Sequence, residues 1–249
     1  MEIICDTNIW YGIGNDLIDK PLIGEDDKFI ATFNSLDELS FTENLINNYD
    51  STQKAIRAMF EFSSKHALFE PPFVYLKVMS DNSYHYDIGA NHKGIIDITQ
   101  KIARGYTIDK IDFFEEIVRN RKESLKNAAD FFNDYVQEHI KPNIKNKKAH
   151  RKENSIPLNR ELINQFVSIQ TGSDGLNENY NWGEIELFEK VLKQFFNDIE
   201  TGAKKIKLND WFDLFLLAYV SPRRKVWTRE KYWIRLIKEV GMEKYLFES

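Results

Sequence analysis

The sequence predicts an α/β protein with a parallel sheet that is covered on both faces by helices. Residues 2–5, with the apolar run Ile3-Ile4-Cys5, predict a short buried strand at the start of the chain, and Lys28–Thr32 predicts a second. A third short strand is expected at residues 225–228, between two helical segments. Strands that alternate with helices are typical of parallel sheets with helices on both faces.

The helix after the second strand is expected to begin at Ser35. Ser35 is a candidate N-cap, and Glu38 follows three residues later, which completes a capping-box pattern. The middle of the chain is expected to be mostly helical, because apolar residues recur at helical spacing over residues 114–140 and 185–199. We expect both apolar stripes to face the core.

Two further helices are expected near the end of the chain. Asn209-Asp210 can cap a helix that stops at Ser221-Pro222. The last helix is expected over residues 231–240, with Gly241 as the residue that ends it.

Composition and charge limit the classes of protein. The 249 residues are 42% hydrophobic and 14% aromatic, which is typical of a folded globular protein. The net charge of -5 argues against a protein that coats nucleic acid non-specifically, although a local basic groove remains compatible with it. The single cysteine, Cys5, predicts a reducing compartment, the cytoplasm. The longest apolar stretch, Leu214–Val220, is too short to span a membrane, which predicts a soluble protein.

Acidic residues recur at the ends of the predicted elements. The carboxyl ends of parallel strands and the adjoining helix starts meet at one edge of a sheet, so these side chains are expected to share a pocket. Like charges at close range raise one another's pKa, and a divalent cation would relieve their repulsion. Oxygen ligands favour Mg²⁺ or Mn²⁺ over zinc. The residues are Asp6, Glu38, Asp210, Asp213 and Glu230.

Several segments resemble those of the PIN-domain nucleases. The segments are Ile4-Cys5-Asp6-Thr7-Asn8, Ser35-Leu36-Asp37-Glu38-Leu39, Asp213-Leu214-Phe215-Leu216-Leu217-Ala218 and Val226-Trp227-Thr228-Arg229-Glu230. The resemblance implies a Rossmann-like, three-layer α/β/α sandwich and metal-dependent cleavage of RNA. It also implies that Asp6, Glu38, Asp213 and Glu230 are the catalytic, metal-binding carboxylates.

The chain departs from the family pattern in three respects. Glu230 stands where the family commonly has Asp, which lengthens the side chain by one methylene. The long separation of Glu38 from Asp213 predicts one domain, 1–249, assembled from about 1–50 and 200–249, with a helical insertion at about 51–199. Asp210 competes with Asp213 for the third acidic position. Asp213 ranks first because an apolar helix follows it, and Asp210 is a further candidate ligand.

Other residues are expected to support the site or bind its substrate. Thr7, Asn8 and Thr228 are candidate hydrogen-bonding partners of the carboxylates. Arg223, Arg224 and Lys225 would hold an RNA backbone beside the site, and the basic run at 141–152 is either a second RNA contact or a solvated loop.

Two other functions stay open at this point. One is a non-catalytic RNA- or protein-binding module on the same scaffold, with a protein partner held by the helical insertion. The other is a different metal-dependent phosphohydrolase, although enzymes that form an aspartyl-phosphate usually carry a second Asp where this chain has Asn8. The sequence leaves open a toxin role, endo- against exonucleolytic cleavage, and the oligomeric state, including a dimer.

Overall fold

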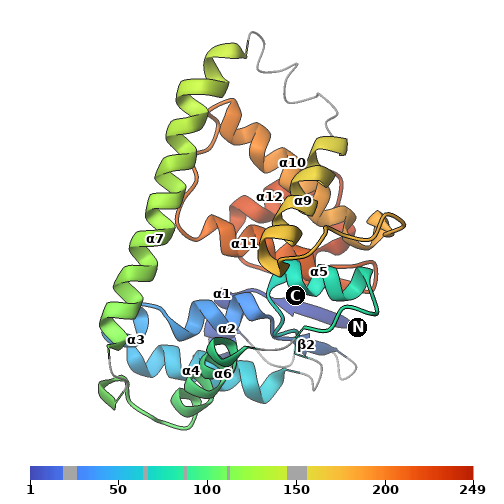
Figure 1. The fold of residues 1–249 in the computed structure, drawn as a ribbon. Helices are drawn as coiled ribbons and strands as arrows, with labels where there is room; N and C mark the ends of the chain where they lie inside the picture. The colour runs from blue at the N-terminus through green and yellow to red at the C-terminus, as the bar shows by residue number, and fades with distance from the viewer. Residues whose placement is uncertain (19–26, 64–66, 87–88, 111–112, 145–155, 249) are drawn as a thin grey trace.

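A small parallel sheet organises the fold (Figure 1). The computed structural model describes residues 1–18, 27–63, 67–86, 89–110, 113–144 and 156–248. Within these residues, three strands form the sheet, in the order β2-β1-β3. β1 (Glu2–Cys5) lies in the centre and pairs in parallel with β2 (Lys28–Ile30) and β3 (Arg224–Trp227). The predicted α/β class and parallel direction are therefore confirmed.

Helices make up most of the described chain. They are α1 (Thr7–Gly14), α2 (Phe33–Ser40), α3 (Asn44–Asn47), α4 (Tyr49–Phe62), α5 (Pro72–Ser80), α6 (Ala90–Ala103), α7 (Phe114–Tyr135), α9 (Ile156–Thr171), α10 (Glu186–Glu200), α11 (Asp210–Leu216) and α12 (Lys231–Glu239). Short helical turns lie at Ile108–Lys110, Val136–Ile140, Lys141–Asn143, Trp182–Ile185, Leu217–Tyr219 and Glu243–Tyr245. No helix of the described residues is long and apolar enough to cross a membrane.

The sheet contributes side chains to two separate groups of core residues. Successive side chains of a strand point to opposite faces. Ile3 and Cys5 of β1 accordingly pack in one group, with buried residues of α1, α2 and α4, whereas Ile4 packs in the other, with buried residues of α5, α9 and α10. Both groups are rich in large buried side chains, so the central strand is enclosed on both faces.

The long helix α7 contributes buried residues to both groups of core residues, Phe114 and Val118 to one and Ala129 to the other. In Figure 1 it runs along one side of the molecule, past α3 at one end and toward α10 at the other. Arg121 Nη1 donates a hydrogen bond of 2.8 Å to the Asp37 carbonyl in α2. Further along α7, Asn133 Nδ2 donates one of 3.0 Å to the Ile206 carbonyl, just before α11. α7 is therefore bonded both to α2 and to the segment that leads into α11.

The expected boundary at residue 50 lies inside a helix. α4 spans Tyr49–Phe62 and packs against α1, with Ala55, Ile56 and Met59 buried. After α4, Leu68 forms an isolated parallel bridge with Thr32 beside β2. The first helix of the proposed insertion, α4, thus begins before residue 50 and packs against α1, which directly follows the central strand. The division of the chain into a domain and an insertion stays a prediction.

Two local expectations require correction. The second strand ends at Ile30 and not at Thr32. The helix expected from Ser35 begins at Phe33, with Thr32 as its N-cap, and Thr32 Oγ1 accepts from the Ser35 amide at 3.4 Å. The capping-box interpretation of Ser35 and Glu38 is therefore wrong. Ser35 Oγ instead donates to the Cys5 carbonyl at 3.1 Å, which joins the first turn of α2 to the end of β1.

The two apolar stripes differ in how well they were predicted. In α10, Leu187, Val191 and Phe195 are fully buried, so that stripe faces the core as expected. In α7, Phe114 and Val118 are buried, but Ile117 is 43% exposed, so the prediction of one continuous core-facing stripe is wrong there. α7 lies at the side of the molecule, and only part of its circumference meets other helices.

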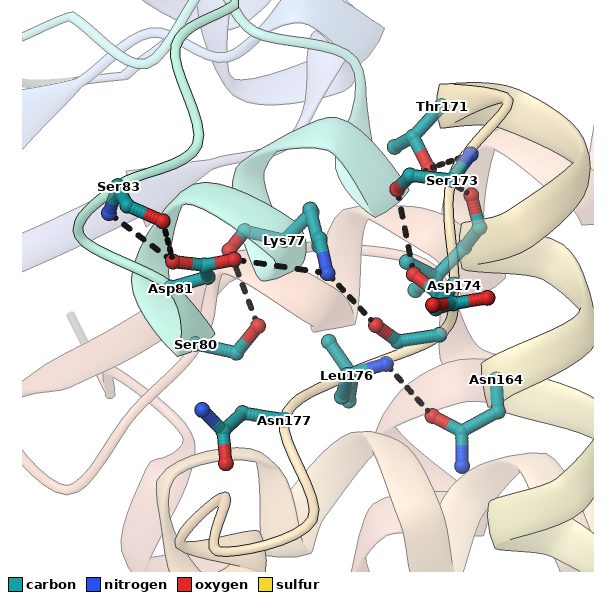
Figure 2. A network of polar contacts seen from close by, with 12 residues as sticks. Lys77, Ser80, Asp81, Ser83, Asn164, Thr171, Ser173, Asp174, Leu176 and Asn177 are labelled. Carbon is teal, nitrogen blue, oxygen red and sulfur yellow. Dashed lines mark hydrogen bonds and ion pairs between the residues drawn. The ribbon is translucent and has the colours of Figure 1, made fainter.

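A polar network joins α5 to the loop that follows α9 (Figure 2). Lys77 is buried, and its ammonium donates to the Gly175 carbonyl at 2.9 Å and lies 3.8 Å from the Asp81 carboxylate. Asn164 Oδ1 accepts from the Leu176 amide at 2.9 Å in the same loop. Because the buried ammonium has partners, this network holds two helices together and needs no ligand.

Gly14 allows α1 to approach α4 closely. A Cβ at Gly14 would lie 2.4 Å from the Lys54 carbonyl oxygen in α4, a backbone atom that cannot rotate away. Gly14→Ala should therefore lower the free energy of unfolding by about 1–3 kcal/mol, as overpacked cores do. Urea unfolding followed by circular dichroism measures this change.

Gly94→Ala in α6 is the matched control, because nothing lies within 4 Å of a Cβ built there. It should stabilise the protein by about 0.4–1 kcal/mol through the unfolded chain. Equal effects of the two substitutions would show that α1 and α4 do not pack as described.

Candidate active site

The carboxyl edge of the sheet brings the first acidic residue to its partner. β1 ends at Cys5 and β3 ends at the paired Trp227, so Asp6 and Thr228 leave the sheet side by side. The Asp6 amide donates to the Trp227 carbonyl at 3.0 Å, which continues the ladder by one residue. Thr228 Oγ1 then donates to Asp6 Oδ2 at 2.7 Å. The predicted supporting role of Thr228 thus corresponds to a hydrogen bond in the structure.

The second carboxylate, Glu38, reaches the same edge from α2. The bond from Ser35 to the end of β1 fixes α2 there, and Glu38 lies one turn further along. Thr7 Oγ1, in the first turn of α1, donates to Glu38 Oε2 at 2.6 Å. The polar residues that follow β1 therefore orient carboxylates that come from other elements.

The two acidic residues from the end of the chain are held in a similar way. Trp233 Nε1, on α12, donates to Asp213 Oδ2 at 2.8 Å, and the indole is buried against Phe195 with ring centroids 5.5 Å apart. Asn8 Nδ2 donates to Glu230 Oε1 at 2.8 Å. Glu230 immediately precedes α12 and is exposed, so its longer side chain reaches back over the start of α1.

All four carboxylates line one cavity of about 440 Å³. Its other lining residues are Asn8, Lys204, Lys207, Leu208, Asn209, Asp210, Tyr232 and Trp233. Among the described residues, no group of three or more His, Cys, Asp or Glu side chains is arranged to hold a metal ion as it stands. The structure therefore gathers the predicted carboxylates into one pocket without a ready-made coordination sphere.

Burial and mutual repulsion raise the pKa of three of these carboxyls. For Asp6, burial raises the pKa to about 6, although the bond from Thr228 lowers it. For Glu38, burial raises the pKa to about 7, and the negative charge of Asp6 adds to the effect. For Asp213, burial and the charges of Asp6 and Glu38 raise the pKa to about 8, against the lowering effect of the Trp233 bond.

These shifts are those expected for carboxylates that are removed from water and face one another. At neutral pH the pocket without a cation retains at least part of its protons. A group that supplied positive charge would favour full ionisation.

Asp210 lines the same cavity, but its carboxylate is already bound by the segment before α11. It is buried, and its carboxylate accepts from Lys204 Nζ and from the Lys207 amide, at 2.8 and 2.6 Å. Both carboxylate oxygens therefore bind the segment that precedes α11. Asp213 by contrast accepts from the uncharged indole of Trp233, and its rank above Asp210 as the third acidic residue stays a prediction.

The predicted RNA-binding residues lie at the other end of the sheet. Arg224 begins β3 and pairs with Glu2 at the amino edge, whereas Asp6 and Thr228 lie beyond the carboxyl edge. Arg224 Nε donates to Glu2 Oε2 at 2.7 Å, and its Nη1 donates to the Tyr75 hydroxyl. The expectation that Arg223, Arg224 and Lys225 lie beside the acidic site is wrong. These residues lie at or near the start of β3, whereas the acidic site lies beyond the end of that strand.

The basic run expected at 141–152 is described only in part. Residues 145–152 lie outside the described residues. Lys141 Nζ donates to Gln137 Oε1 at 2.7 Å.

Several residues of the pocket were missed from the sequence, among them Trp233, Lys204 and Lys207. Trp233 gave no signal, because a buried tryptophan on an amphipathic helix is usually a core residue. Lys204 and Lys207 belong to the basic segment Lys204-Lys205-Ile206-Lys207, just ahead of Asp210, and that cluster was a detectable signal. The positive charge of the pocket therefore comes from this segment and not from β3.

Comparisons with known proteins returned no match: no protein-family model matches the chain, and no curated protein or solved structure is significantly similar to it.

The raised pKa values predict how stability depends on pH. Unfolded Asp and Glu ionise near 3.8 and 4.5, whereas the folded pocket keeps protons up to about 6, 7 and 8. The folded state thus binds more protons between about pH 4 and pH 8, so the free energy of unfolding should fall as the pH rises through this window. Urea unfolding in EDTA at several pH values measures it.

Asp213→Asn should make this pH dependence shallower, because it removes the most strongly shifted group. Asp97→Asn, on the exposed side of α6, is the control and should leave the dependence unchanged. Equal pH dependences for both variants would contradict the electrostatic description of the pocket.

Proposed function

We propose that the protein is a divalent-metal-dependent ribonuclease of the PIN type. The observation that carries the proposal is the pocket at the carboxyl edge of the sheet, where Asp6, Glu38, Asp213 and Glu230 line one cavity. Parallel α/β folds bind ligands at this edge. The two core groups on opposite faces of β1 support the finer proposal of a three-layer α/β/α sandwich.

The donor set suits Mg²⁺ or Mn²⁺. The candidate ligands are carboxylate oxygens, with no sulfur or imidazole among the residues that line the cavity. Mg²⁺ commonly takes one or two carboxylates, several waters and the oxygens of a bound phosphate, so it does not need a complete set of protein ligands. Asp6 and Asp213 are the best candidates, because burial raises the pKa of both and the charge of Asp6 further raises that of Asp213.

Such an ion would supply an activated water and stabilise the oxygen that leaves the phosphodiester. The chain itself provides orientation. Thr228 Oγ1 donates to Asp6 Oδ2, and Trp233 Nε1 donates to Asp213 Oδ2, so a neutral side chain orients each carboxylate. Thr7 holds Glu38 in the same way.

Glu230 has a different place in this arrangement. It is exposed, and Asn8 binds its Oε1, so it lies at the mouth of the pocket and not in its floor. A contact with the cation through a water fits the longer side chain. The RNA specificity of the proposal rests on the resemblance of the quoted segments to PIN-domain nucleases.

Replacement of the central carboxylates tests the proposal. Asp6→Asn and Asp213→Asn should each reduce Mn²⁺-dependent cleavage of a labelled single-stranded RNA by at least about 100-fold, because each removes a charge that the cation needs. Asp97→Asn should cleave at the wild-type rate.

Three outcomes would contradict the proposal. They are wild-type protein without nuclease activity, cleavage that survives both substitutions, and release of phosphate from small phosphate esters in place of RNA cleavage. The first would favour a binding module, and the last a different phosphohydrolase.

A further inference from the structure

A short basic segment, which connects α10 to α11 in the chain, forms one wall of the pocket. It comprises Lys204-Lys205-Ile206-Lys207, and we call it the basic segment. Lys204 and Lys207 line the cavity, whereas Lys205 is not among its lining residues. A nucleic acid backbone that approaches the carboxylates meets net negative charge, so it needs local positive charge at this wall.

The charge of Lys204 is already neutralised. Its ammonium lies 2.8 Å from both oxygens of the Asp210 carboxylate and 4.2 Å from the centre of the Tyr232 ring. Lys204 is also largely buried in this position, with its side chain 12% exposed. It therefore anchors the basic segment and has little capacity for a further anion.

Lys207 differs from Lys204 in each of these respects. Its side chain is exposed, and within the described residues its ammonium has no ion-pair partner. Its amide nonetheless donates to Asp210 Oδ2 at 2.6 Å, and its carbonyl accepts from the Asp210 amide at 3.1 Å. The backbone of Lys207 is thus fixed while its charge is available.

Asn133 of α7 fixes the same segment from the opposite side. Its Nδ2 donates to the Ile206 carbonyl at 3.0 Å, and its Oδ1 accepts from the Ile206 amide at 2.8 Å. Ile206 itself is buried. The basic segment is therefore held by two carboxamide bonds to α7 and by the bonds to Asp210, which is the kind of support that a binding residue needs.

We infer that Lys207 binds a phosphate of the single-stranded RNA backbone next to the bond that is cleaved, and that Asn133 and Asp210 position it. This inference rests on the proposed function, since it names a substrate contact of the same pocket. It assigns Asp210 a positioning role in place of metal binding. It also gives α7, from the helical middle of the chain, a part in building the substrate-binding wall.

The test is the salt dependence of RNA binding. The probe is a fluorescein-labelled single-stranded 12-mer in Ca²⁺, with affinity measured by anisotropy from low to moderate salt. Each phosphate contact with a single strand contributes about 0.7 to the slope of log affinity against log salt. Lys207→Gln should lower the magnitude of the slope by about that amount, alike for several RNA sequences, and Lys207→Arg should restore it.

Lys205→Gln is the matched control, because Lys205 is exposed on the same segment but does not line the cavity. It should change the slope less than Lys207→Gln. Asn133→Ala keeps Lys207 but frees the segment, so it should weaken binding with the slope largely retained. Circular dichroism checks that each variant is folded.

The outcomes separate the two proposals. If the wild-type protein cleaves RNA but Lys207→Gln and Lys205→Gln have the same slope, the inference about Lys207 is wrong and the nuclease proposal stands. If the wild-type protein neither binds nor cleaves RNA, the proposed function is wrong and the inference falls with it.

Discussion

The central physical constraint in this structure is the unfavourable free energy of burying several ionised carboxylates at one edge of a small sheet. Burial is the first cause of the raised pKa at Asp6, Glu38 and Asp213, and repulsion from neighbouring carboxylates, Glu230 among them, adds to it. An uncharged side chain donates to each of them: Thr228 to Asp6, Thr7 to Glu38 and Trp233 to Asp213. Neutral donors orient a carboxylate without cancelling its charge. In the proposed function a cation supplies the positive charge that lysine or arginine partners would otherwise have supplied.

The sheet and the acidic positions could be predicted because they depend on local pattern. The apolar run before Asp6 gives a strand, and the end of a parallel strand fixes where the next side chain lies. The capping role assigned to Glu38 was wrong because Thr32, three residues before the expected N-cap Ser35, caps α2. Sequence pattern alone could not choose between these two polar residues.

The basic cluster at residues 204–207 is visible in the sequence, but its position beside the carboxylates could not be derived from it, for a different reason. Arg224 is near Glu230 in the chain, but the full length of β3 separates them in space. Lys207 reaches the pocket because Asp210 and Asn133 fix its backbone, and Asn133 comes from a helix far away in the chain. Such tertiary bonds leave no periodic signal. The helical middle of the chain thus takes part in the pocket that its two ends build.

The most direct test of this account is calorimetric titration of the protein with Mn²⁺ at pH 7, in two buffers of different ionisation enthalpy. Because the carboxyls of Glu38 and Asp213 retain protons near this pH, binding of Mn²⁺ should release protons to the buffer, and Asp213→Asn should release fewer. The absence of Mn²⁺ binding, or binding with no proton release in either protein, would contradict a pocket of desolvated carboxylates that a cation stabilises.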